Sequence, residues 1–207
     1  LLFAFVPQFG LEGIWVSVFT AISAFCNAGF DLFGRFGAYS SLVPYVNNYY
    51  VQAVIMFMIM AGGLGFMVWV ELAEYRKKRR LSLHAKVVLQ FSVIFWVGGA
   101  VLLALLEWSN PRTMGGLSVP GKIMAALFQS VSTRTAGMNT IDLAACSPIS
   151  KLLMSVLQFI GAAPGSTGGG VKVTTFAVLI LTIRSVAQGR DDCVIGGHHI
   201  ASKTVYR

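Results

Sequence analysis

Charged residues are scarce in this sequence. Only 12% of its 207 residues are charged, whereas a soluble domain usually carries about twice that fraction. Hydrophobic residues make up 56% of the chain. The shortage of charge therefore excludes an ordinary soluble domain and indicates a protein whose solvent is lipid.

Acidic residues are fewer still. Asp and Glu together number 8 against 16 Lys and Arg, which gives a net charge of +8. An excess of this kind can indicate nucleic-acid binding. Here the basic residues cluster beside long apolar runs, as they do on the cytoplasmic side of membrane proteins. The charge pattern therefore argues for membrane topology and against a nucleic-acid partner.

Cysteine and histidine offer no recognisable metal or catalytic site. The three cysteines, Cys26, Cys146 and Cys193, have no metal-like spacing, and no CxxC, HExxH or GxSxG motif occurs. His198 and His199 are neighbours in a polar tail, and two adjacent histidines make a poor ligand set. We therefore expect a protein that is not an enzyme. Because the chain begins without methionine, we also expect it to be part of a longer protein.

Glycine, by contrast, is concentrated at residues 161–170, which contain five glycines and a proline. The apolar runs 149–160 and 171–183 flank this stretch, and each carries one charge. Either run alone, as a helix, would reach only about 20 Å, short of a hydrocarbon core of roughly 30 Å. The pattern predicts a membrane helix broken at mid-depth. Irregular backbone at that depth must line a water-filled cavity or be buried in protein, so the break suggests a permeation route.

Two uncharged runs of twenty residues, 51–70 and 87–106, are each long enough to span a membrane. Within the first, glycines at residues 62–65 would permit close approach of a neighbouring backbone. Five consecutive cations at residues 76–80 predict that this end faces the cytoplasm. Two crossings later, the basic tail 184–207 would return to the same side.

The same order of segments occurs twice: a short helix, a glycine turn and a spanning helix. Short apolar segments at residues 14–25 and 122–131 are too short to cross a membrane and suit re-entrant helices. The spacing between matched residues is 109 before the turn and 108 within it. The matched pairs are Phe19 with Phe128, Ser23 with Ser132, Ala28 with Ala136 and Gly29 with Gly137.

Such a repeat has a physical meaning in ion transport. A cation cannot leave water unless other groups replace its hydration shell, and backbone carbonyls do this in potassium filters. A short helix that ends near a pore axis, followed by an extended segment with glycine, presents such carbonyls. Two units cannot close a four-sided pore, so we expect the functional protein to contain more of them.

Three stretches resemble the Trk/Ktr/HKT superfamily of potassium transporters, most of all the membrane subunit of Ktr-type uptake systems. They are FCNAGFD at residues 25–31, FQSVSTRTAGMNTID at 128–142 and PGSTGGGVK at 164–172. The resemblance implies an all-α integral membrane protein with repeated units of helix, pore helix, filter loop and helix, including a broken transmembrane helix. It places the chain from late in the second repeat through the third. The expected divisions are residues 1–82, residues 83–187, and a cytoplasmic linker at 188–207.

The resemblance also implies roles for individual residues. The potassium filter positions would be Cys26, Asn27, Ala28 and Gly29 in one repeat and Arg134, Thr135, Ala136 and Gly137 in the next. The intramembrane gating loop would include Gly161, Gly165, Ser166, Thr167, Gly168, Gly169, Gly170 and Lys172. Two departures from the family pattern are Met138, where Phe is usual, and the Ala-Ala-Pro sequence at 162–164. Neither removes a backbone carbonyl, so they bear on the stiffness of the loop more than on selectivity.

The resemblance further implies partners and location. Members of the family work as homodimers in the plasma membrane, as multi-pass proteins in contact with membrane lipid. They carry a cytoplasmic regulatory subunit that binds nucleotide, and no nucleic acid. Potassium is the transported ion, and the resemblance leaves sodium open as a coupling ion. No organic cofactor is expected.

Several residues have simpler explanations that stay open. Gly29 and Gly137 would also suit plain loop turns. Lys172 lies at membrane depth, where it would either contribute to the gate or snorkel to the interface. We expect Arg134 to turn away from the pore and to pair with Asp142 or Glu107. Residues 165–172 superficially suggest a phosphate-binding loop, but Val171 stands where that motif needs lysine.

The sequence therefore predicts one part of a pore that translocates potassium through a filter of backbone carbonyls, gated by a glycine-rich loop. The alternative is a secondary transporter that binds a small solute at its broken helix. Charged or aromatic residues that face a midplane pocket would favour this alternative. A membrane-embedded enzyme is disfavoured because no nucleophile, base or metal group is evident.

Overall fold

The computed structural model describes residues 1–37, 39–188, 193–195 and 198–200, and within these ranges the fold is almost entirely helical. The helices are α1 (Leu2–Phe9), α2 (Glu12–Phe25), α3 (Tyr49–Gly63), α4 (Phe66–Lys78), α5 (Leu83–Glu107), α6 (Val119–Thr133), α7 (Pro148–Phe159) and α8 (Val173–Ala187), with short 3₁₀ turns at Phe33–Phe36 and Val43–Tyr45. Strands β1 (Cys193–Ile195) and β2 (His198–Ile200) form an antiparallel hairpin. The helical body agrees with the sequence, whereas the hairpin lies in the segment expected to be a linker.

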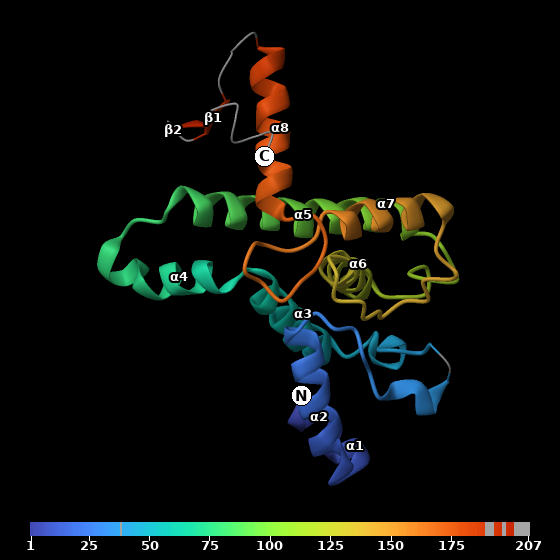
Figure 1. Ribbon diagram of the computed structural model, residues 1–207. Helices are drawn as coiled ribbons and strands as arrows, with labels where there is room; N and C mark the ends of the chain where they lie inside the picture. The colour runs from blue at the N-terminus through green and yellow to red at the C-terminus, as the bar shows by residue number, and fades with distance from the viewer. Residues whose placement is uncertain (38, 189–192, 196–197, 201–207) are drawn as a thin grey trace.

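The helices form a layered arrangement around α6 (Figure 1). Helices α5 and α7 run side by side, and α6 packs against α5 and α3. Helix α4 folds back along α5, and α8 leaves the α5–α7 layer in a different direction. The short helix α2 packs against α3, on the other side of the molecule from α8. This arrangement brings the ends of α2 and α6 toward the centre.

Helix α5 is the one helix, among the residues described, that is long and apolar enough to cross a membrane without a partner. Its 25 residues correspond to roughly 37 Å at 1.5 Å per residue. The Ser82 side chain accepts a hydrogen bond from the amide of Ala85 and caps its start. Most of its apolar surface faces outward, as expected for contact with lipid.

The first predicted span, residues 51–70, is not continuous. Helix α3 ends at Gly63 and α4 begins at Phe66, and the two helices are bent by 99°. Gly65 takes the left-handed conformation at φ 85°, which breaks the helical ladder. Thus the expectation of an uninterrupted helix is wrong.

The close approach expected at the same glycines is confirmed. A Cβ atom built on Gly62 would lie 1.8 Å from the carbonyl oxygen of Phe25 at the end of α2. No side chain fits there, because real Cβ contacts are never so short. Gly62 therefore lets the end of α2 rest directly on the backbone of α3.

The second predicted break is present. Helix α7 begins at a serine cap, since the amide of Ser150 donates to Ser147 Oγ, and Pro148 occupies the first turn as helix starts favour. Residues 160–172, here called the glycine-rich loop, separate α7 from α8. Its two ends pair as a parallel bridge between Ile160 and Val171. The loop therefore returns to where it began, and α8 starts beside the end of α7 (Figure 1).

The largest apolar core lies where α1, α2, α3 and α6 meet. Its bulkiest buried members are Phe5, Phe33 and Phe128. The core also includes Ala136 and Met138, which follow α6 directly. Packing of these two residues fixes the position of the segment that the sequence singled out.

Candidate functional site: two glycine turns and a glycine-rich loop

Each of the two short helices ends in a turn of the same shape. The first turn comprises residues 26–29 after α2, and the second comprises residues 134–137 after α6. In the first, φ is positive at Asn27 (50°) and Gly29 (75°). In the second, φ is positive at the equivalent Thr135 (76°) and Gly137 (82°). Alternating left-handed residues turn successive peptide planes, so each turn exposes backbone polar groups that no helix satisfies.

A serine in the last turn of each helix holds the chain that leaves its turn. Ser23 Oγ donates a 2.6 Å hydrogen bond to the carbonyl of Phe30. The matching Ser132 Oγ donates to the carbonyl of Met138. Both donors and both acceptors are residues that the sequence repeat makes equivalent. The shared geometry therefore extends the repeat from sequence to hydrogen bonding.

The two turns lie in direct contact. A Cβ atom built on Gly29 would lie 2.7 Å from the carbonyl oxygen of Ala136, and one built on Gly137 would lie 3.3 Å from the Cα of Gly29. Residues more than a hundred positions apart in sequence thus meet backbone to backbone. Only glycine allows both the positive φ and this separation at residue 29.

The glycine-rich loop is hydrogen-bonded to both turns. Thr167 Oγ1 donates to the carbonyl of Phe25 at 2.8 Å and accepts from Asn27 Nδ2 at 2.9 Å. The amide of Gly169 donates to Thr135 Oγ1 at 3.1 Å. Asn27 and Thr135 are equivalent positions in the two turns. The loop therefore crosses beneath the pair of turns and contacts each of them at the same place.

The loop also rests on the break between α3 and α4. The amide of Ala163 donates to the carbonyl of Gly63 at 3.0 Å, and that of Thr167 donates to the carbonyl of Gly62 at 3.2 Å. A helix leaves its last carbonyls without partners. Here the loop supplies the missing donors.

The start of α4 also donates a hydrogen bond to the glycine-rich loop. The amide of Phe66, in its first turn, donates to the carbonyl of Gly165 at 3.1 Å. A Cβ atom on Gly65 would lie 2.5 Å from the carbonyl oxygen of Pro164. The α3–α4 break and the glycine-rich loop therefore fit each other through backbone groups alone.

Lys172 closes the loop from within. Its Nζ donates to the carbonyl of Gly168 at 2.8 Å, and the side chain is half-buried. The contact is local, four residues apart. It agrees with an anchoring role inside the loop and leaves the expectation of a role in gating as a proposal.

Arg134 is buried, and its predicted partners are wrong. The side chain is 5% exposed, and its Nη2 donates to the carbonyl of Gly161 at 2.6 Å. Asp142 Oδ1 instead accepts from the amide of Ala144. Glu107 likewise bonds other residues, so neither carboxylate reaches the guanidinium within the part of the chain described.

Glu107 is a buried acid whose role the sequence did not indicate. It is fully buried and accepts four hydrogen bonds, from Ser147 N (2.9 Å), Ser150 Oγ (2.5 Å), Asn110 Nδ2 (2.7 Å) and Thr113 Oγ1 (2.7 Å). These donors come from the loop after α5 and from the start of α7. In the sequence, the one feature that pointed to Glu107 was its place as an acid at the end of the apolar run 87–106. The bonds fix α7, and with it the entrance to the glycine-rich loop.

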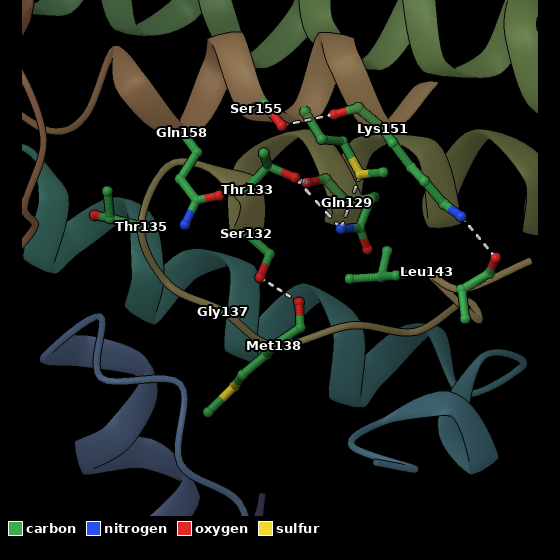
Figure 2. A pocket seen from close by; sticks show the side chains of 12 residues that line it. Gln129, Ser132, Thr133, Thr135, Gly137, Met138, Leu143, Lys151, Ser155 and Gln158 are labelled. Atoms are coloured by element: carbon green, nitrogen blue, oxygen red, sulfur yellow. Dashed lines mark hydrogen bonds between the residues drawn. The ribbon is translucent and has the colours of Figure 1, made fainter. Parts of the chain in front are cut away.

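A cavity of about 570 Å³ opens between α6, α7 and the second turn (Figure 2). The labelled side chains that face it are mainly polar: Gln129, Ser132, Thr133, Thr135, Ser155 and Gln158. Lys151 is the one charged residue in its lining, and its Nζ is engaged by the carbonyl of Ala144 at 2.8 Å. No aromatic ring lines the cavity. The lining therefore offers a bound solute one charged residue and no aromatic ring.

A long apolar helix, two re-entrant-length helices that end in touching turns, and a broken helix beneath them define a helical membrane protein of the transport class. Comparison with known proteins identifies the family. The model of the TrkH family, described as a cation transport protein, matches residues 4–207. The chain belongs to this family, whose members are transporters and not enzymes.

Curated relatives include the potassium/sodium uptake protein NtpJ of Enterococcus hirae, 36% identical over 98% of this chain and 44% of the relative. The Ktr system potassium uptake protein B of Vibrio alginolyticus is 41% identical over 87% of this chain and 39% of that protein. The crystal structure of the potassium transporter TrkH from Vibrio parahaemolyticus has a TM-score of 0.73 and 21% identity, covering 99% of this chain and 44% of the other. That similarity shows the fold. The chain spans less than half the length of the proteins it matches.

Proposed function

We propose that this chain forms part of a membrane pore that translocates potassium through a filter of backbone carbonyls. The single observation that carries the proposal is the contact between Gly29 and the second turn, where two equivalent backbones meet. Relatives that share more than a third of their aligned residues are named for potassium uptake. A dehydrated cation needs several oxygens that converge from different sides. Two touching turns supply oxygens from two sides.

In this proposal residues 1–82 and 83–187 are two pore units, and residues 188–207 are a cytoplasmic linker. The filter positions are residues 26–29 and 135–137; Arg134 is left out because its side chain is buried and bonded to the carbonyl of Gly161. Further units of the same kind, in a protein as long as its relatives, would supply the remaining walls. The protein would be a multi-pass protein of the plasma membrane, and the cations at residues 76–80 support a cytoplasmic position for the end of α4.

We propose the glycine-rich loop as the gate. It lies across both turns and is held by Thr167, by the amide of Gly169 and by the α3–α4 break. Glycine-rich backbone has few side chains to lock it in place, so breaking a small number of hydrogen bonds would release it. A loop of this kind can block a path in one state and clear it in another.

Further partners follow from the family resemblance alone. They are a second copy of the protein, a cytoplasmic subunit that binds nucleotide, and membrane lipid. Both passive flow and coupling to sodium stay within the proposal. The alternative function, solute transport at the broken helix, is less well supported because the lining of the cavity beside the second turn has no aromatic ring and a single charged residue, Lys151, which is bonded to the carbonyl of Ala144.

The decisive test uses the full-length protein in a host that lacks its own potassium uptake. Wild type should restore growth at low potassium, whereas Gly29→Asp and Gly137→Asp should abolish uptake or its preference for potassium over sodium. Gly116→Asp is a matched control, since a side chain there meets open space. Unchanged potassium preference in both turn variants would contradict the filter assignment.

A further inference from the structure

Arg134 is a buried cation without an acidic partner. Its side chain is 95% buried, and within the residues described no carboxylate lies within ion-pair distance of it. Burying an unpaired charge is expensive unless other groups stabilise it. The structure must therefore offer the guanidinium another source of negative potential.

That source is the carbonyl of Gly161 in the glycine-rich loop, just beyond the end of α7. Gly161, whose carbonyl accepts from Arg134 Nη2 at 2.6 Å, is two residues beyond Phe159, the last residue of the helix. The end of a helix concentrates unsatisfied carbonyls and the negative pole of its dipole. A cation placed there forms a charge-assisted hydrogen bond stronger than one between neutral groups.

Two aromatic rings of α5 complete the site. The guanidinium carbon lies 5.5 Å from the ring centre of Phe95 and 5.8 Å from that of Trp96. Both distances are within the range of a cation–π interaction. The rings cover the side chain from behind, so Arg134 is held between α5, the end of α6 and the end of α7.

This contact has no counterpart in the other unit. The carbonyls at the end of α3 are bound by loop amides, namely those of Ala163 and Thr167. The carbonyl of Gly161, at the corresponding end of α7, is bound by a side chain that belongs to the second glycine turn. The start of the glycine-rich loop is therefore fixed to that turn by one charged residue.

We infer that Arg134 is a positioning residue of the gate: it holds the carbonyl of Gly161 at the start of the glycine-rich loop and thereby favours the closed loop, without contacting the ion. This inference rests on the proposed function and adds a mechanism to it. It gives the Arg134 side chain a different role from the backbone of Thr135, Ala136 and Gly137, which forms the proposed filter.

The test measures potassium uptake by the full-length protein expressed alone. Arg134→Gln removes the charge and keeps a polar, though shorter, side chain. It should raise the maximal uptake rate on the order of tenfold, the factor that one charged hydrogen bond is worth, while KM and the preference for potassium over sodium stay unchanged. Arg134→Lys should restore most of the closed behaviour, because an ammonium can still meet the end of the helix. Arg112→Gln, at an exposed arginine of the α5–α6 loop, is the control and should match wild type.

A second variant acts on the same contact from a distance. Phe95→Leu removes one ring behind the guanidinium and should raise the maximal rate by a smaller factor. If Arg134→Gln yields too little protein in the membrane, Phe95→Leu decides the question.

Three results would overturn the inference. They are an unchanged or lowered maximal rate in Arg134→Gln at normal protein levels, a changed potassium preference, and an unchanged rate in Phe95→Leu. A wild-type protein that takes up no potassium would instead remove the proposed function, and the inference with it.

Discussion

The two units of this molecule differ in the break of the helix that follows each glycine turn, α3–α4 in one unit and α7–α8 in the other. In the first unit only residues 64 and 65 separate α3 from α4. In the second, residues 160–172 separate α7 from α8. The carbonyls at the end of α3, beside the short break, accept hydrogen bonds from amides of the long break between α7 and α8. The comparison shows that the break in the first unit is the surface on which the glycine-rich loop of the second unit packs.

The glycine turns, in contrast, are alike in both units. Each has two left-handed residues at equivalent positions and a serine that holds the departing chain. The turns therefore share a backbone geometry that the two breaks do not share. Four experiments probe this difference, and they follow from the largest expected effect to the smallest.

The contact between the end of α2 and Gly62 of α3 should tolerate substitution least. Gly62→Ala places a Cβ atom 1.8 Å from the carbonyl oxygen of Phe25, so α2 and α3 must separate. We expect loss of most folded protein, measured as the monodisperse fraction after detergent extraction, together with loss of potassium uptake. Gly98→Ala, on the open face of α5, should behave like wild type because nothing lies near its Cβ position. Normal yield and uptake in Gly62→Ala would show that α2 and α3 can move apart without loss of the fold.

The two turns should respond unequally to alanine, despite their similar shape. At Gly29 a Cβ atom would meet the carbonyl oxygen of Ala136 at 2.7 Å, whereas at Gly137 the nearest atom lies at 3.3 Å. Both residues have positive φ, which costs alanine roughly 1 kcal/mol. Gly29→Ala should therefore reduce uptake and potassium preference more than Gly137→Ala, measured by ion competition. Equal losses would indicate that conformation alone, and not crowding, limits the turns.

The loop should be held more firmly by the first turn than by the second. Thr167→Val removes two side-chain hydrogen bonds, one to Asn27 in the first turn and one to Phe25 directly before it, and Thr135→Val removes one from the second turn. At about 1 kcal/mol each, these losses should raise the maximal uptake rate of the protein expressed alone, more for Thr167→Val. Thr175→Val on α8 is the exposed control. A larger effect from Thr135→Val would reverse the order of the two contacts.

Lys172 should have the smallest effect. Its Nζ makes one local bond, to Gly168, and no contact with either turn. Lys172→Met keeps the apolar stem and should change the maximal rate by less than a factor of about three, since a single half-buried bond contributes little. A change as large as that of Thr167→Val would assign Lys172 a direct part in the gate.

Local patterns determined much of this protein. Apolar runs and low charge gave the helical membrane character, since burial in lipid requires satisfied backbone and few charges. Glycine and serine spacing located both turns and the glycine-rich loop, because left-handed backbone and helix caps depend on neighbouring residues. The equivalence of Ser23 and Ser132 was visible as a repeat before their hydrogen bonds were known.

Tertiary structure alone decided which segments meet. The bend after Gly63 was not predicted from the apolar run, because the amides that bind the carbonyls left there belong to the glycine-rich loop about a hundred residues later. Arg134 had two acids as candidate partners, yet it binds a backbone carbonyl of the glycine-rich loop, whose position the sequence does not state. A backbone carbonyl becomes an electrostatic partner only when folding brings it there, so the contact depends on three-dimensional packing and not on residue type.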